Sequence, residues 1–214
     1  MNTYTTGLKV KNMDNSEFLE RFIPEDRSSG MFIHIQAVTR QKDHPAMHIR
    51  ERARMHWLVR DRKEFHDLLP EMRGVADSTG SRIYMNITPK SMKALHAMLL
   101  ADFAKQNMYG DIQNPDRTVN SAAGRLKPSH GDRRMLVDVD VKDMLYTLEV
   151  ERTIRGLLKD GVTDEIVYVP TLHGVHLITG VFDRRKFAEI YPDIDIHMNS
   201  MGSLLYMNTE DGKN

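Results

Sequence analysis

Hydrophobic and polar positions follow two different periods along this chain. Short runs in which apolar residues alternate with polar ones, or follow one another, predict strands at residues 31–39, 55–59, 82–88, 136–141, 165–170, 175–179, 193–197 and 204–208. Apolar residues three and four positions apart predict helices near residues 16–22, 65–75, 92–103, 143–159 and 182–190. The strands interleave with helices but also form hairpin-like pairs. The pattern therefore predicts an α+β fold with mixed or antiparallel sheets and packed helices.

Two segments interrupt these periods. Pro70 falls inside the helical pattern of residues 65–75 and predicts a break or kink there. Residues 107–132 are rich in Gly, Asn, Pro, Ser and Asp and have no clear period, so we expect a long loop.

The length of 214 residues suits one generous domain or two small ones. We expect residues 1–30 to form an N-terminal arm, residues 31–208 a single domain and residues 209–214 a polar tail. A subdivision of the domain would give an N-terminal subdomain at residues 31–107.

The composition excludes several classes of protein but does not indicate a particular reaction. Hydrophobic residues make up 40% of the chain and charged residues 28%, as in globular proteins. Thirty basic residues balance thirty acidic ones, so any electrostatic argument has to be local. The absence of cysteine excludes disulfides, thiolate metal sites and a cysteine nucleophile. No apolar run approaches the roughly 20 residues of a membrane helix, and the chain start is too polar for a signal peptide, so we expect a cytoplasmic protein without a membrane partner.

The segment LVDVDV places two carboxylates two residues apart in a predicted strand. Asp138 and Asp140 then project from one face, while Val137, Val139 and Val141 project from the other. Adjacent carboxylates repel each other unless a cation lies between them, and Mg²⁺ or Mn²⁺ suits such a pair. The alternative is two solvated acids on the exposed face of an edge strand.

Two later segments carry further candidates. In the segment at residues 169–179, Gly174 permits a sharp turn or a close approach to a ligand, and His176 emerges within an apolar strand. His173 is a weaker candidate of the same kind. His176 could instead be a half-buried structural residue. The segment DIDIH repeats the alternating acids, with Asp193 and Asp195 as alternative third carboxylates.

The order of these three segments resembles the archaeo-eukaryotic primase superfamily, the primase–polymerases. LVDVDVKDM is similar to the acidic strand of that family, the run from Thr171 to His176 is similar to its Ser/Thr-to-His element, and DIDIH supplies a last acid. Thr replaces the usual Ser, and a cysteine-bearing zinc element and a helicase module are missing.

The resemblance implies a primase-like catalytic core with an RRM-like sheet, in a catalytic subdomain at residues 82–208. It implies that Asp138, Asp140 and Asp195 bind Mg²⁺ or Mn²⁺ and that His176, with Thr171 and His173 beside it, contacts a nucleoside triphosphate. The reaction would be nucleotidyl transfer on a single-stranded template, with a helicase or another replication protein as a partner.

Two basic clusters are candidates for phosphate contacts. Arg125 and Lys127 precede the acidic strand, where they would suit a triphosphate or a template backbone. Residues 40–62 are also rich in Lys and Arg, although an ordinary surface of mixed charge would look the same. Trp57, the only tryptophan, is expected in the core.

Two other functions use the same residues. The acids could activate water in a metal-dependent nuclease or another phosphotransfer enzyme. A catalytically inactive nucleic-acid-binding protein could also retain a primase-like fold. A P-loop, a zinc-protease helix motif and a nucleophile elbow are all missing from the sequence, which removes support for those three classes.

Overall fold

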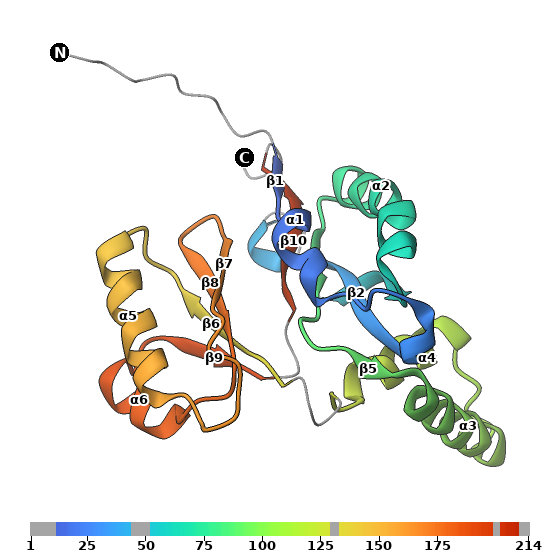
Figure 1. Cartoon of the computed structure of the whole chain (residues 1–214). Coiled ribbons are helices and arrows are strands. Elements are labelled where there is room, and N and C mark those ends of the chain that lie inside the picture. The colour runs from blue at the N-terminus through green and yellow to red at the C-terminus, as the bar shows by residue number, and fades with distance from the viewer. Residues whose placement is uncertain (1–11, 44–51, 129–132, 199–201, 210–214) are drawn as a thin grey trace.

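A computed structural model describes residues 12–43, 52–128, 133–198 and 202–209, and in these residues two antiparallel sheets pack together, each with its own helices (Figure 1). The predicted α+β fold with antiparallel sheets is thereby confirmed. Within the described residues, no helix is long and apolar enough to cross a membrane.

The first sheet contains strands from both ends of the chain. Its strands, in spatial order, are β1 (Asn12–Asp14), β10 (Ser203–Asn208), β4 (Arg82–Met85), β2 (Met31–Thr39) and β3 (Arg52–Val59), with β5 (Lys90–Ser91) pairing with β2. Alternate residues of β2 face opposite sides. Ile33 and Ile35 enter the core that also contains buried residues of α2 (Arg62–Thr79), whereas Phe32 packs with α3 (Met92–Tyr109) and α4 (Pro115–Arg125).

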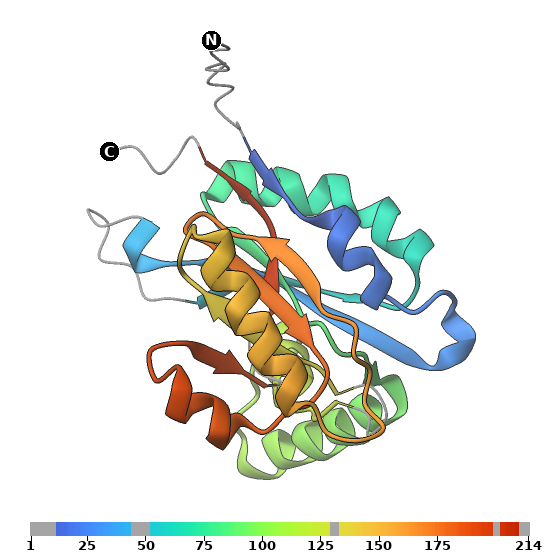
Figure 2. The same cartoon turned by 60° about the vertical axis from the view of Figure 1, so that its left-hand side comes forward.

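The second sheet is a βαββαβ unit. Its strands lie in the order β7 (Val167–Pro170), β8 (Val175–Thr179), β6 (Met135–Val139) and β9 (Asp195–His197), and all neighbours are antiparallel. Helix α5 (Met144–Leu157) connects β6 to β7, and helix α6 (Arg184–Ile190) connects β8 to β9. This is the split βαβ connectivity of ferredoxin-like and RRM-like sheets. Helix α5 lies across one face of the sheet (Figure 2).

The alternating pattern of β6 decides which side chains reach the other face. Val137 and Val139 are buried in the cluster that includes Val150 of α5 and Phe187 of α6. Leu136 projects to the opposite side, where it joins the core shared with the first sheet. Asp138 therefore projects away from α5 and α6, toward the first sheet.

One prediction about this part of the chain is wrong, and one about a helix is wrong in part. Residues 107–132 do not form one long loop, because they contain α4. Asn114 caps this helix, Pro115 occupies its first turn, and its buried residues are the short Thr118, Ala122 and Ala123, which leave no strong hydrophobic period. Pro70 does not break α2, since the helix continues on both sides of it, whereas a kink at Pro70 stays a prediction.

The segment expected as an N-terminal arm is part of the fold where it is described. Strand β1 pairs with β10, α1 (Ser16–Leu19) follows it, and two short 3₁₀ turns, η1 (Glu20–Phe22) and η2 (Arg27–Ser29), precede β2; a third, η3 (Gln41–Asp43), follows β2. Leu19, Phe22 and Ile23 are buried in the core between the sheets. Trp57 is also buried, as predicted, and its Nε1 donates to Glu71 Oε1 at 3.0 Å.

Residues 82–208 contribute to both sheets. Strands β4, β5 and β10 pair in the first sheet, and the βαββαβ unit occupies residues 135–197 between them. The chain therefore enters the second sheet from the first sheet and returns to the first sheet after it. Residues 1–11 and 210–214, which include most of the predicted polar tail, lie outside the described residues.

Candidate functional site

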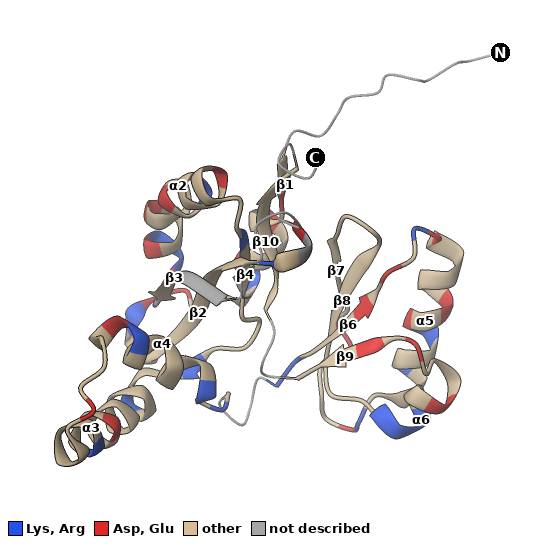
Figure 3. Ribbon diagram, turned by 180° about the vertical axis from the view of Figure 1, so that it is seen from behind, with Lys and Arg blue, Asp and Glu red and all other residues tan. Residues whose placement is uncertain are grey.

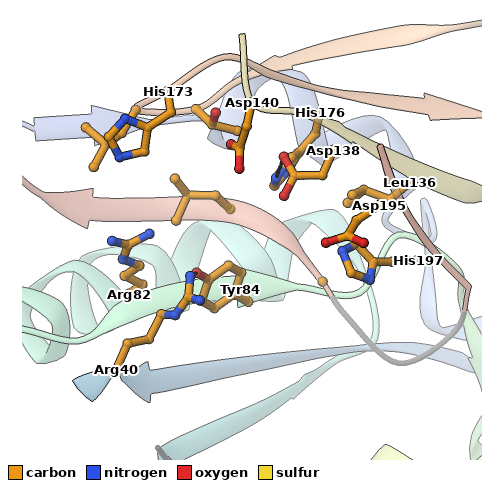
Figure 4. A pocket seen from close by; sticks show the side chains of 14 residues that line it. Arg40, Arg82, Tyr84, Leu136, Asp138, Asp140, His173, His176, Asp195 and His197 are labelled. Carbon is orange, nitrogen blue, oxygen red and sulfur yellow. Dashed lines mark hydrogen bonds and ion pairs between the residues drawn. The ribbon is translucent and has the colours of Figure 1, made fainter. Parts of the chain in front are cut away.

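A cavity of about 340 Å³ lies between the two sheets. The second sheet and its β7–β8 turn supply six ionisable side chains to its lining: Asp138, Asp140, Asp195, His173, His176 and His197. The first sheet and the residue after β2 supply Arg40, Arg82 and Tyr84. Figure 4 shows the acids and histidines on one side of the cavity and the two arginines with the tyrosine on the other.

Three of these side chains form a row across neighbouring strands. Asp138 on the central strand β6 lies directly opposite His176 on β8 and directly opposite Asp195 on β9. Directly opposed residues in antiparallel strands have their Cβ atoms about 5 Å apart and project from the same face. His176 Nε2 lies 3.4 Å from Asp138 Oδ1. Strand pairing thus gathers residues that are far apart in the sequence, and Figure 3 shows acidic positions on both β6 and β9.

The turn between β7 and β8 brings two more candidates to the end of β6. The backbone N–H of Thr171 donates to the Gly174 carbonyl at 3.0 Å, and the Gly174 N–H donates to Thr171 Oγ1 at 3.0 Å. A Cβ on Gly174 would lie 1.8 Å from the Val139 carbonyl oxygen, so only glycine allows this close packing. Asp140, one residue beyond β6, consequently lies near His173 (Figure 4).

His176 is nearly buried, with 8% of its surface exposed. Its Nδ1 lies 3.1 Å from the hydroxyl oxygen of Ser203, which is fully buried at the start of β10. The ring therefore has one partner in each sheet, Asp138 in the second and Ser203 in the first.

The opposite wall of the cavity is cationic. Arg82 forms an ion pair with Asp43 at 2.5 Å, and both side chains are largely buried. The guanidinium of Arg40 donates to the hydroxyl of Tyr84 at 3.3 Å. The cavity thus has guanidinium groups on one side, with the charge of Arg82 balanced by Asp43, and carboxylates on the other. Such a lining suits a ligand that carries both phosphates and metal ions.

The carboxylates of the cavity are of the type that binds hard divalent cations, but their side chains do not lie close enough together to share one. Carboxylate oxygens are the ligands that Mg²⁺ and Mn²⁺ take. In the described part of the chain, no three His, Asp or Glu side chains are close enough together to hold a metal ion. Asp140 and Asp195 are exposed, whereas Asp138 is half-buried beside His176. Metal binding would require Asp140 and Asp195 to turn toward Asp138.

The structure brings most of the predicted site residues together. Asp138, Asp140, Asp195, His176, His173 and Thr171 all line the cavity. Asp193 is exposed and precedes β9 outside the lining, so Asp195 is the acid of that pair at the cavity.

The predicted basic contacts lie elsewhere. Arg125 ends α4 and forms an ion pair with Asp102 of α3, at a separate pocket of about 230 Å³. Lys127 is exposed and lines neither pocket. Proximity in the sequence to Asp138 suggested these two residues, but among the described residues Arg40 and Arg82 are the Lys and Arg side chains that line the cavity.

Sequence reasoning missed several lining residues. His197 could have been found, because it follows Asp195 by two positions in a strand and so shares its face. Arg82 and Tyr84 alternate with the buried Ile83 and Met85 of β4, which marks a polar face but not its use. Ser203 does not line the cavity but contacts His176, and it has no local signal, because this contact depends on how the sheets pack.

Comparisons with models of protein families, with curated proteins and with solved structures found no match.

Proposed function

We propose that this protein is a metal-dependent nucleotidyltransferase that acts on nucleic acid in the manner of a primase or primase–polymerase. One observation carries the proposal. Asp138, Asp140, His176 and Asp195 come from three separate segments whose order resembles the primase superfamily, and all four line one cavity. The βαββαβ sheet that bears them also agrees with the RRM-like core that the resemblance implies.

The carboxylates are the proposed metal ligands. Asp138, Asp140 and Asp195 would hold Mg²⁺ or Mn²⁺, and such ions supply activation of the attacking 3′-hydroxyl and stabilisation of the leaving pyrophosphate. Asp138 Oδ1 lies 3.4 Å from His176 Nε2. The other two acids are exposed and able to turn toward it.

The cationic wall is the proposed triphosphate contact. Arg40 and Arg82 face the acids across a cavity whose volume of about 340 Å³ falls in the range of small-molecule sites. An imidazole N–H of His176 would donate to a phosphate oxygen. The chain itself thus positions and neutralises the reacting groups and forms no covalent bond with them. A single-stranded template is the proposed nucleic-acid partner, and a helicase or another replication protein is the proposed protein partner.

The test is incorporation of labelled nucleoside triphosphates. The full chain would be incubated with Mg²⁺ or Mn²⁺ and single-stranded templates, with and without an annealed primer, and the products resolved on denaturing gels. We expect new or extended strands with the wild type and none with Asp195→Asn. Asp193→Asn is the matched control, because it changes an exposed acid two residues away that does not line the cavity. Equal activity of the two variants would contradict the proposed site.

A metal-dependent nuclease is the second candidate. The observation that favours it is the presence of His173, His176 and His197 beside the acids, because an imidazole can accept a proton from attacking water. Shortened template in the same assay would select this activity. Template binding without turnover, unchanged in Asp195→Asn, would instead identify a catalytically inactive nucleic-acid-binding protein.

A further inference from the structure

His176 is the one cavity histidine for which the structure gives a polar partner at each ring nitrogen among the described residues. Nδ1 lies 3.1 Å from Ser203 Oγ, and Nε2 lies 3.4 Å from Asp138 Oδ1. The imidazole is 8% exposed and Ser203 is not exposed at all. Water has little access to the contact between His176 and Ser203, so the partners of the ring influence which nitrogen carries the hydrogen.

The two neutral tautomers differ in how they meet these partners. With hydrogen on Nδ1, the lone pair of Nε2 would lie 3.4 Å from the negatively charged carboxylate of Asp138, which repels it. With hydrogen on Nε2, this repulsion is absent, and Nδ1 is left to accept a hydrogen bond from the Ser203 hydroxyl. The second arrangement is therefore favoured at both nitrogens.

We propose that Ser203 is a positioning residue of the cavity, whose hydroxyl donates to His176 Nδ1 and holds the ring in the Nε2–H tautomer. The Nε2–H then points toward Asp138 and the proposed phosphate site. The catalytic part of this inference rests on the proposed nucleotidyl transfer, whereas the tautomer itself does not.

The position of Ser203 explains how one sheet can orient a side chain of the other. Ser203 begins β10 of the first sheet, opposite Met85 of β4. A Cβ on the preceding Gly202 would lie 2.6 Å from the Met85 backbone, so glycine lets the chain approach β4 closely just before Ser203. The hydroxyl therefore reaches His176 only when the two sheets are packed together.

The chain Asp138–His176–Ser203 has the residue types of a hydrolase triad, but its geometry assigns a different role. A serine nucleophile must meet its substrate, and Ser203 has no exposed surface. The hydroxyl is oriented toward the histidine as a fixed donor, and the ring presents its other nitrogen to the cavity.

Long-range ¹H–¹⁵N correlation spectra of the ¹⁵N-labelled full chain in mildly alkaline buffer test the tautomer directly. The His176 signal is assigned by its absence from His176→Gln. We expect the Nε2–H tautomer in the wild type and a mixture of tautomers in Ser203→Ala. Nucleotide incorporation by Ser203→Ala should fall by about 10-fold, the size of effect seen when the hydrogen-bond partner of a functional histidine is removed.

The matched control is Ser81→Ala. Ser81 is 2% exposed and its hydroxyl lies 2.9 Å from Thr39 Oγ1, at the same sheet but outside the cavity lining. This variant should keep the His176 tautomer and the incorporation rate. An equal loss of rate in both variants would show that Ser203 acts only as a structural residue, and it would overturn the proposal.

Other outcomes also separate the alternatives. An Nδ1–H tautomer in the wild type overturns the proposal even where Ser203→Ala does not fold, and so does an unchanged tautomer in a folded Ser203→Ala. The protein could also incorporate no nucleotide while the His176 tautomer changes in Ser203→Ala. This result would refute the proposed function but support the proposal that Ser203 fixes the tautomer of His176.

Discussion

His34 and His176 occupy comparable positions in the two sheets but have different surroundings. Each lies within an apolar strand, β2 or β8, and each is nearly buried, with 2% and 8% of its surface exposed. His34 Nε2 lies 2.9 Å from Asn120 Oδ1 on α4, so a helix covers this face. His176 instead has a carboxylate beside it and lines an open cavity.

The environment of His34 is cationic and dry. Lys90 is 1% exposed, and its ammonium donates to the Ala123 carbonyl at 2.6 Å. Burial, followed by the positive charge of Lys90, lowers the pKa of His34 to about 3. Burial also lowers the pKa of Lys90 to about 8. His34 is therefore a neutral structural residue at physiological pH.

A histidine in an apolar strand thus indicates a polar partner and nothing more specific. What covers the strand face decides its use. Helix α4 supplies His34 with an amide, whereas the neighbouring strands of the second sheet supply His176 with Asp138 and, one strand further, Asp195. Four predictions test this contrast, in order of decreasing effect.

The largest effect is expected at the cavity row. Asp138→Asn should lower nucleotide incorporation by roughly 1,000-fold or more, because it removes a proposed metal ligand. The melting temperature should change little, since the amide keeps the size of the side chain. His34→Gln should leave the rate unchanged. A large loss of rate in His34→Gln would break the comparison.

Acid should destabilise the protein through His34. Its pKa is 6.5 in the unfolded chain and about 3 in the fold, so the unfolded chain binds more protons between these values. The free energy of unfolding should therefore fall as pH drops from 6.5 toward 3, by about 4 kcal/mol. Denaturant titrations at several pH values measure this slope. His34→Gln should reduce it, and an equal slope in that variant would assign the effect to other groups.

Alkali should stabilise the protein through Lys90. The pKa falls from 10.5 to about 8 on folding, so the stability that is missing below pH 8 is gained as pH rises toward 10.5. We expect a gain of about 3 kcal/mol in the free energy of unfolding. Lys90→Met keeps a long apolar side chain without the amine and should abolish the rise, whereas the exposed Lys93→Met should preserve it.

The smallest effect concerns the two basic regions. Arg40→Gln should raise KM for the nucleoside triphosphate by about 10-fold, because it removes a cation from the cavity wall. Arg125→Gln should leave KM unchanged, since Arg125 is paired with Asp102 at a separate pocket. Steady-state kinetics of both variants measure these KM values. A raised KM in Arg125→Gln with an unchanged KM in Arg40→Gln would place the phosphate contact in the segment before β6.

Much of the fold could be predicted because its signals are local. Strand β2 has the predicted bounds, and the turn between β7 and β8 lies where Gly174 suggested it. Helix α4 could not be recognised from its hydrophobic pattern, because alanines and a threonine form its buried side. Their burial depends on Phe32 and Leu95, which the fold brings against them.

The amino-acid pattern alone determined the face on which each candidate lies. Val137 and Val139 had to turn away from Asp138, and Ile196 away from Asp195, because successive residues of any strand project to opposite sides. Only the tertiary structure decided that β8 and β9 flank β6, and that the first sheet supplies Arg40, Arg82 and Ser203. The physical reason is that side-chain alternation is a property of the local backbone. The choice of neighbouring strands depends instead on how distant segments bury their apolar faces together.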